Sequence, residues 1–367
     1  FFLWTPAEIR AVLDPKDADL AIRFYGVSEA GNFAGRNILH VPVAPEDFAA
    51  ATGISVADLW QRLERIDQAL YQARETRPHP HRDEKILTGW NGMMIAALAE
   101  AGDALGEPRY VAAAERAADL LWAKVRTAPG ELRRLHLEGR AAQPGLLEDY
   151  ALFGEGLIAL YDATADSTRL AQARELADAL WTRFADPAGG GLFMGEAATD
   201  TPLMARPKDL SDGAMPSATS AALHLLAALA RRTDAMIYEE RSKALVASAS
   251  GQVQRAPSAF PALLVGLSRL RQGDTGPGQY AARGALRVEA RVQPQGAGAA
   301  NPTPTLALDL DLAPGWHLNA HRPLQDYLIP TTVRLAGEVP GWHLGEVRYP
   351  NPEVLKLGFQ REPLAVY

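Results

Sequence analysis

The chain has 367 residues, more than one ordinary hydrophobic core accommodates, so we expect two domains. Its composition, 47% hydrophobic and 22% charged, is that of a globular protein, and no apolar run is long enough to cross a bilayer. A formal net charge of -7 without a basic stripe argues against nucleic acid and membrane surfaces as partners. With no cysteine, these residues form no disulfide, thiolate metal site or redox-active thiol pair.

The beginning of the chain predicts short helices around a turn-rich loop. Thr5-Pro-Ala-Glu8 is a capping box with proline at the first helical position, and it predicts a helix over 6–13. A second helix is expected through 20–24. Residues 38–41 follow several turn formers and are predicted as a strand. Ser55 then caps a longer helix whose apolar residues recur at steps of three and four.

From residue 90 onward a pair of helices repeats. An Ala/Leu-rich helix is followed each time by an amphipathic one, and a further apolar helix begins near residue 260. The three pairs are 90–105 with 110–125, 147–163 with 170–184, and 217–231 with 236–249. Helices that are apolar nearly all round are typically buried on both sides, so the amphipathic ones should lie outside. An inner ring wrapped by an outer ring is an α/α toroid; a linear solenoid with the same two layers is the alternative.

The remaining segments predict β structure. Two inserts between helices, 131–138 and 189–195 with 203–206, are expected to be hairpins. Residues 286–292 and 306–312 alternate apolar and polar side chains, as half-buried strands do, and 333–335 and 347–349 continue the pattern. These strands predict the start of an all-β sandwich.

The domain organisation follows from these patterns. We predict a toroid over 1–271, a Gly/Gln/Pro-rich linker over 272–284 and a truncated β-sandwich over 285–367. Because the first residue is Phe and the last lies in an expected strand, we expect the chain to be a fragment. No targeting segment is recognisable, and a cytoplasmic location is expected.

Dense polar segments open three of the apolar helices. In a toroid the beginnings of the inner helices surround one cavity, so these polar groups are expected to meet there. Aromatic faces combined with carboxylates and hydrogen-bond donors suit a sugar. The candidate catalytic residues are His79, His81, Asp83, Asp149 and Asp212; the candidate substrate-binding residues are Arg82, Lys85, Trp90, Asn91, Glu148, Tyr150, Arg206, Lys208, Asp209 and Ser217.

Two reactions stay open for such a cavity. In epimerisation or isomerisation, one of the two histidines would abstract a proton next to a carbonyl while Arg82 or Lys85 stabilises the enolate. In glycoside hydrolysis, two of the three aspartates would flank the glycosidic bond.

Each candidate also has a purely structural interpretation. Glu148 and Asp149 in a first helical turn would offset the helix dipole, and Ser217 would be a plain N-cap. The pair of histidines lacks a third ligand at a recognised spacing, so no metal is expected, and no cofactor is indicated. His224, in the middle of an apolar helix, is expected to be a hydrogen-bonded core histidine.

Four ordered motifs resemble the YyaL-type thioredoxin-domain proteins, the spermatogenesis-associated protein family of animals. They are GNFAGRNILH (31–40), HRDEKILTGWNG (81–92), LEDYA (147–151) and RPKDLSDGAMPS (206–217). The resemblance covers about residues 1–271. It implies a six-hairpin α/α toroid, similar to those of N-acylglucosamine 2-epimerases and six-hairpin glycosidases, that follows a thioredoxin-like domain absent here.

The segment 315–331, GWHLNAHRPLQDYLIPT, looks like the N-terminal immunoglobulin-like domain of the DsbD thiol:disulfide interchange protein. That domain works in a redox relay through a cysteine pair, which these residues lack. We therefore predict a carbohydrate-directed domain, epimerase/isomerase-like or glycosidase-like, with a small-molecule carbohydrate as partner. The alternative is a non-catalytic sugar- or protein-binding scaffold attached to a thiol–disulfide redox module, with a redox protein as partner.

Overall fold

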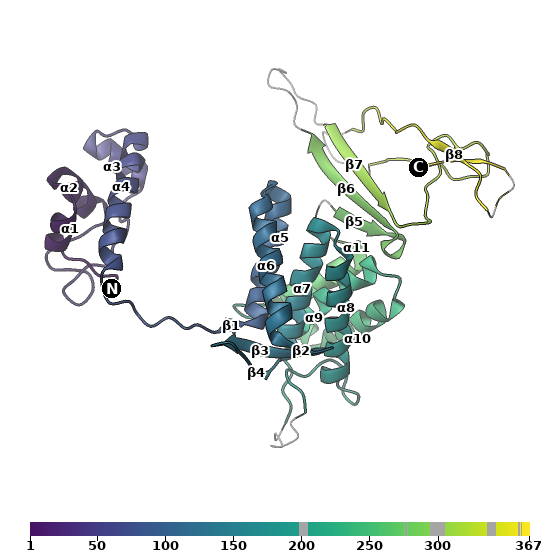
Figure 1. Cartoon of the computed structure of the whole chain (residues 1–367), viewed down its shortest axis with the longest axis horizontal. Coiled ribbons are helices and arrows are strands. Elements are labelled where there is room, and N and C mark those ends of the chain that lie inside the picture. The colour runs from purple at the N-terminus through teal and green to yellow at the C-terminus, as the bar shows by residue number, and fades with distance from the viewer. Residues whose placement is uncertain are drawn as a thin grey trace. The chain divides into compact units, whose positions relative to one another are not determined.

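The computed structural model describes residues 1–197, 205–274, 276, 278–293, 305–335, 343–358, 360 and 362–367. The chain divides into two compact units, Phe1–Glu84 (the first unit) and Lys85–Tyr367 (the second unit), both drawn in Figure 1. This division falls inside the range 1–271 that the sequence assigns to one domain, and the predicted domain boundaries themselves stay predictions. Among the helices that the structure describes, none has the length and apolar character needed to cross a membrane.

The first unit is built from four helices, α1 (Pro6–Val12), α2 (Pro15–Phe24), α3 (Pro45–Thr52) and α4 (Val56–Glu75). The predicted capping box is confirmed, because Glu8 N donates to Thr5 Oγ1 and Thr5 N donates to Glu8 Oε2, at 3.2 and 2.8 Å. Ser55 caps α4 as expected. The buried face of α4 and apolar residues of the other three helices form one core.

The strand predicted over 38–41 is wrong, because this segment is a loop. Asn side chains take the place of a neighbouring strand there: Asn32 Oδ1 accepts from Ile38 N at 2.8 Å, and Asn32 Nδ2 donates to Ile38 O at 2.9 Å. Such side-chain bonds satisfy backbone groups without a sheet. Helix α3, which directly follows this loop, is an addition to the predicted elements.

The second unit contains the repeated helix pairs. They are α5 (Thr88–Leu105) with α6 (Pro108–Val125), α7 (Leu147–Thr164) with α8 (Ser167–Phe184), and α9 (Ala218–Arg232) with α10 (Met236–Arg255), followed by α11 (Pro261–Gln272). Helices α5, α7, α9 and α11 pack on one another in succession, and α6, α8 and α10 each pack on their own partner (Figure 1). The predicted pairs and their two layers are confirmed, and the described chain is mainly helical. Closure into a complete toroid stays a prediction.

Two glycines bring α5 and α7 into backbone contact. A Cβ atom on Gly92 would lie 2.5 Å from the carbonyl oxygen of Leu152, and one on Gly156 would lie 2.7 Å from the carbonyl oxygen of Gly92. Only glycine fits between two backbones at that separation. The inner layer is therefore tightest between its first two helices.

A small antiparallel sheet lies at the beginnings of α5 and α7. Its central strand β3 (Glu131–Leu137) pairs with β1 (Ile86–Leu87), β2 (Arg126–Ala128) and β4 (Arg140–Pro144). The first predicted hairpin is thus confirmed. The second falls partly outside the described residues; of its described part, 189–195 contains one isolated bridge, from Leu192 to Ala185, and no strand.

The C-terminal part contains two described sheets. Strands β5 (Gly278–Ala281), β6 (Leu286–Gln293) and β7 (Thr305–Leu312) form an antiparallel sheet, and β8 (Glu353–Leu355) pairs with β9 (Leu364–Val366). The strands predicted over 286–292 and 306–312 are confirmed, and the sandwich stays a prediction. The strands expected at 333–335 and 347–349 are wrong, since both segments are loops joined by a hydrogen bond from Val333 N to the Tyr349 hydroxyl, at 3.1 Å.

The predicted linker 272–284 is partly ordered into β5 and a short 3-10 helix, Ala282–Gly284. Tyr280 explains this order, because its hydroxyl donates to Asp162 Oδ1 of α7 at 2.8 Å and its ring stacks on Tyr161. Although this segment has the composition of a linker, Tyr280 anchors β5 against the helices.

Candidate functional site

Asp149, a predicted catalytic residue, joins two inner helices. Its Oδ1 accepts from Gly89 N at the start of α5, at 3.0 Å, and its Oδ2 accepts from Leu146 N before α7, at 2.9 Å. The residue is 2% exposed. Burial raises the pKa of Asp149 to about 6, although these hydrogen bonds and the Arg134 guanidinium act in the opposite direction.

Asp212 does the same for the next two inner helices. Its Oδ1 accepts from Ser217 N before α9, and its Oδ2 accepts from Ala262 N in α11, both at 2.8 Å. Burial by itself raises the pKa of Asp212, but these hydrogen bonds outweigh it and the pKa is lowered. Ser217 is the N-cap of α9, as its structural interpretation requires, and Asp209 Oδ2 accepts from Ala218 N at 2.8 Å.

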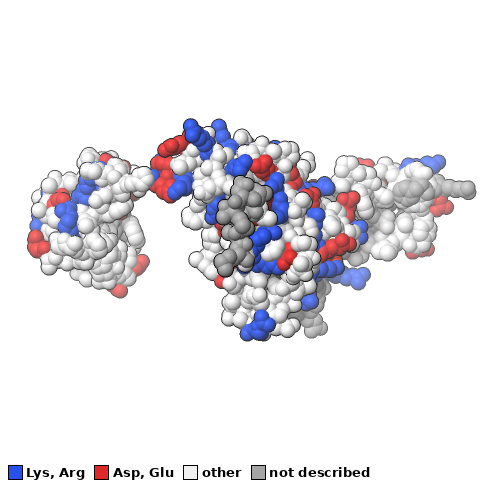
Figure 2. Space-filling model, turned by 90° about the horizontal axis from the view of Figure 1, so that it is seen from below, with Lys and Arg blue, Asp and Glu red and all other residues white. Residues whose placement is uncertain are grey.

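Most of the other predicted residues of the second unit also hold the backbone or a neighbouring charge. Glu148 pairs with Arg134 and Lys208 with Asp186, each at 2.6 Å; Asn91 donates to Leu87 O, Tyr150 accepts from Leu132 N, and Arg206 donates to Gly195 O. Lys85 immediately precedes β1, and Trp90 is 56% exposed. Figure 2 shows basic and acidic side chains interspersed over the face of the second unit seen there, without a continuous area of one sign.

His79, His81, Arg82 and Asp83 belong to the first unit. The His79 ring packs on Phe1 and its Nε2 lies 3.5 Å from a carboxylate oxygen of Glu75, while Arg82 forms a bidentate pair with Glu84. The joint action of these residues with those of the second unit stays a prediction. Across the described residues, no three His, Asp or Glu side chains are grouped so that they could hold a metal ion.

A cavity of about 330 Å³ lies in the second unit, between the C-terminal halves of the inner helices and the sheet of β5 and β6. Alanines of α5, α7 and α9 form part of its lining. Its ionisable lining comes from all four inner helices, from both strands and from the segment between α11 and β5: Glu100, Asp103, Glu155, Asp162, His224, Arg232, Arg269, Asp274, Tyr280, Arg287 and Glu289. The sequence analysis did not select these residues. The available signal was a few charged residues on helices otherwise apolar all round.

His224 and Glu155 form a pair in the wall of this cavity. His224 Nε2 lies 2.7 Å from Ala262 O, and because a carbonyl only accepts, Nε2 carries the hydrogen. His224 Nδ1 therefore faces Glu155 Oε2, at 3.5 Å. Burial alone lowers the pKa of His224, but the adjacent Glu155 outweighs it and the pKa is raised. The expected hydrogen bond of a core histidine is confirmed, and the ring nevertheless lines a cavity.

Three polar groups of the lining have unused hydrogen-bonding capacity. Within the described part of the chain, the carboxylates of Glu100 and Asp103 form no hydrogen bond or ion pair, and the buried Nε of Arg269 has no acceptor. Burial raises the pKa of both carboxyl groups, and Arg269 partly offsets this for Glu100. The cavity thus presents two carboxylate acceptors, the Arg269 Nε donor and the adjacent His224 and Glu155 side chains to whatever occupies it.

An ionic network fixes one wall of the cavity. Arg232, whose side chain is 4% exposed, donates to both carboxylate oxygens of Asp162, at 2.8 and 2.6 Å, and to Asp274 at 2.9 Å. Tyr280 of β5 donates to the same Asp162. Since these charges satisfy one another, the strand is held against α7 and α9 while the other groups stay available.

Comparison with known proteins relates this chain to proteins of animals. Over 300 residues, 74% of the chain, it is 33% identical to spermatogenesis-associated protein 20 of mouse and of human. The chain is homologous to spermatogenesis-associated protein 20. It spans 38% of the length of these relatives. No family model matches the chain.

Three solved structures have a distant likeness to the chain. Cellobiose 2-epimerase from Spirochaeta thermophila has a TM-score of 0.42 at 21% identity, covering 52% of this chain and 55% of that one. D-mannose isomerase has a TM-score of 0.40 at 18% identity, covering 56% and 57%. The GH76 α-mannanase BT2949 from Bacteroides thetaiotaomicron has a TM-score of 0.38 at 15% identity, covering 47% and 46%. These are likenesses of fold, and no residue role follows from them.

Proposed function

We propose that the cavity of the second unit binds a small carbohydrate and that the Glu155–His224 pair transfers a proton in an epimerisation or isomerisation. The observation that carries this proposal is the pair itself, in which Nδ1 of a partly buried histidine faces a carboxylate inside a cavity. A general base needs a basic group of raised proton affinity next to the reacting carbon, and His224 has a raised pKa.

The other lining groups suit a polyhydroxylated ligand. The unpaired carboxylates of Glu100 and Asp103 accept from hydroxyl groups, and Arg269 Nε donates. The alanines of the inner helices give C–H faces an apolar surface. A hydroxyl group that accepts from Arg269 Nε would relieve the cost of leaving this buried donor unpaired, which is about 1–3 kcal/mol.

The reaction would proceed through proton transfer alone. His224 Nδ1, which carries no hydrogen in the neutral ring, takes the proton from the carbon next to the sugar carbonyl, and the Glu155 carboxylate stabilises the resulting imidazolium. The electron pair moves onto the carbonyl oxygen, where Arg269 stabilises the charge. Return of the proton to the other face of that carbon gives the epimer. Return to the former carbonyl carbon, with the proton of the adjacent hydroxyl group passing to the former carbonyl oxygen, gives the isomer. Glu100, with a pKa raised by burial, is a second group able to carry a proton. In this proposal His224 and Arg269 take the roles that the sequence analysis assigns to His79 or His81 and to Arg82 or Lys85.

Solvent exchange tests the proposal directly. The full chain is incubated in D₂O with glucose, mannose and cellobiose, and deuterium at C2 is followed by NMR. We expect incorporation that falls at least about 100-fold in His224→Gln and in Glu155→Gln, the size of general-base effects. The matched control is Glu240→Gln on the exposed side of α10, which should exchange like the wild type.

Other outcomes point elsewhere. Hydrolysis of cellobiose without exchange would favour a glycosidase that uses two of the lining carboxylates. Sugar-dependent thermal stabilisation without turnover would favour a binding scaffold, because a ligand of the folded state raises stability by mass action. Exchange that persists in both pair variants would overturn the assigned roles. A thiol–disulfide partner stays a prediction, since its cysteines would have to come from outside these residues.

A further inference from the structure

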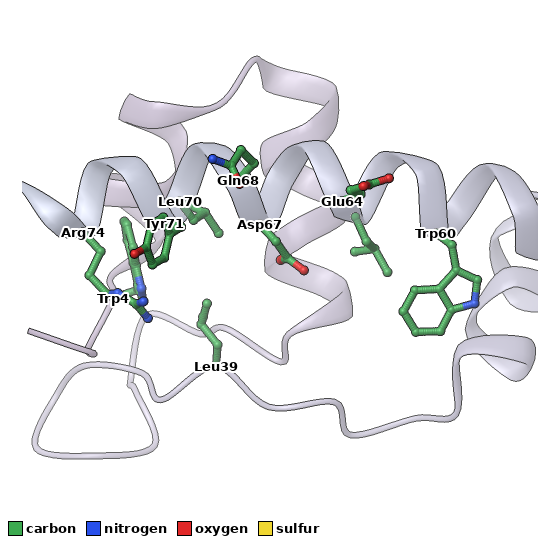
Figure 3. Close-up of a pocket in the computed structure, with 10 residues that line it drawn as sticks. Trp4, Leu39, Trp60, Glu64, Asp67, Gln68, Leu70, Tyr71 and Arg74 are labelled. Atoms are coloured by element: carbon green, nitrogen blue, oxygen red, sulfur yellow. The ribbon is translucent and has the colours of Figure 1, made fainter. Parts of the chain in front are cut away.

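The first unit carries its own groove, which does not depend on the function proposed for the second unit. The groove has a volume of about 610 Å³ and runs between α4 and the loop that contains Leu39 (Figure 3). Buried Leu63 and Leu70 contribute to its floor, and Trp60, Glu64, Asp67 and Tyr71 contribute to its exposed walls.

The groove has the length of a short peptide. Its lining residues on α4 recur every three or four positions from Trp60 to Arg74, so they form one face of the helix. At 1.5 Å per residue, this face is about 21 Å long. An extended chain of about six residues spans the same length, whereas a compact metabolite covers only part of it.

Aromatic side chains stand at intervals along the groove. The Trp60 side chain is 52% exposed and that of Tyr71 is 50% exposed, and Figure 3 shows them well separated along α4. Large aromatic residues that are partly exposed beside an apolar floor are the common anchors of peptide and protein interfaces.

Between the two aromatic residues the charge of the groove is negative. Arg74, which also lines the groove, lies beyond Tyr71, and its guanidinium packs over the rings of Phe1, Phe2 and Tyr71. Within the described residues, the Glu64 carboxylate forms no hydrogen bond or ion pair, and Asp67 accepts only from the Tyr25 hydroxyl, at 2.5 Å. The two carboxylates are three positions apart on α4 and hence neighbours on its surface. A cation placed between the two carboxylates would compensate their negative charge.

We propose that this groove binds a peptide segment of another protein in which apolar side chains alternate with Lys or Arg. The apolar side chains would pack on Leu39, Leu63 and Leu70. The cationic ones would pair with Glu64 and Asp67, and the face of the Trp60 indole offers them a further favourable contact. Because side chains alternate along an extended peptide, one strand can serve both the floor and the acidic wall.

A labelled synthetic peptide tests this proposal on the full chain. Fluorescence anisotropy is recorded with an octapeptide of alternating Leu and Lys, and with a matched peptide of alternating Leu and Glu. We expect the Leu/Lys peptide alone to bind, and Glu64→Gln and Trp60→Ala each to weaken it about tenfold, with the loss of the charge also reducing the salt dependence. Glu46→Gln, which removes an exposed carboxylate of α3 outside the groove, is the control and should bind like the wild type.

Several results would overturn the proposal. Equal binding of both peptides, or binding that neither groove variant weakens, would show adsorption elsewhere. Absence of binding at millimolar peptide would exclude a peptide of this chemistry. Sedimentation that reveals a concentration-dependent dimer lost in Trp60→Ala would assign the groove to a second copy of the chain.

Discussion

The backbone N–H of Gly89 donates to Asp149 Oδ1 at 3.0 Å, between residues 60 positions apart in the chain. One carboxylate thereby satisfies an otherwise unpaired N–H at the start of α5 and, through its second oxygen, another before α7. Asp212 repeats the arrangement for α9 and α11. Asp149 and Asp212 therefore hold neighbouring inner helices together at their N-terminal ends. This structural role does not require a ligand.

Removal of the Asp149 carboxylate should loosen both helix beginnings. In Asp149→Ala the N–H groups of Gly89 and Leu146 lose their acceptor, so we expect their amide hydrogens to exchange about tenfold faster or more. Glu148→Gln, one position earlier, leaves both acceptors in place and serves as control. Hydrogen exchange measured by NMR is the direct readout. The global stability is less direct, because Asp149→Ala also removes the cost of burying the carboxylate. Unchanged protection of both amides in the alanine variant would contradict the assigned bonds.

The raised pKa of Asp149 predicts a pH-dependent stability. The folded pKa of about 6 lies above the value of about 3.9 expected in the unfolded chain, so between these values the folded state binds more protons. The stabilisation that comes from the raised pKa of Asp149 is therefore complete below about pH 4. As the pH rises from 4 to 6, this stabilisation is lost, which lowers the free energy of unfolding by about 3 kcal/mol. Urea unfolding across this pH range should show a free energy of unfolding that falls more steeply with pH in the wild type than in Asp149→Ala. Parallel pH profiles would rule out a raised pKa.

The repeated helices could be predicted from the sequence because their signal is local. A helix such as α7, apolar on nearly every face, must be covered on both sides, and its amphipathic partner α8 supplies one cover. The cavity could not be predicted in this way. Glu155 and His224 belong to different helices, and their pairing depends on the register of α7 against α9. Similarly, β5 is distinguished from a true linker by its pairing with β6 and by the contact of Tyr280 with Asp162, and neither can be read from local composition.

The close packing of α5 on α7 makes Gly92 intolerant of a side chain. In Gly92→Ala the new methyl group would lie 2.5 Å from the Leu152 carbonyl oxygen, a backbone atom that cannot move without displacing α7. Overpacking of this kind costs about 1–3 kcal/mol of unfolding free energy. Gly213→Ala is the control, because its Cβ would meet nothing within 4 Å, and a change within about 0.5 kcal/mol is expected. Equal unfolding free energies of the two variants would contradict the contact.

The cavity wall depends on Arg232. Replacement by Met leaves Asp162 and Asp274 without their shared cation. Because these carboxylates are 34% and 18% exposed, water solvates part of the charge left behind, and we expect a loss of about 2–3 kcal/mol, less than for a fully buried pair. Lys243→Met breaks an exposed pair with Glu239 and should cost less than about 1 kcal/mol. Urea unfolding compares the two variants. Similar small losses in both would mean that the Arg232 network contributes little to holding β5 on the helices.

The titration of His224 reports whether the proposed proton-transfer pair exists in solution. Its pKa is raised because Glu155 outweighs burial, so Glu155→Gln should leave burial and the Arg269 charge dominant and lower the pKa below the ordinary value. In the wild type the charged pair stabilises the fold at low pH, and this contribution is lost as the pH rises through the folded pKa. NMR titration of the ring protons measures both variants, with Glu240→Gln as the control that should leave the His224 pKa unchanged. A His224 pKa that does not move in Glu155→Gln would separate the two side chains, and the base assigned to the cavity would then have to be another group.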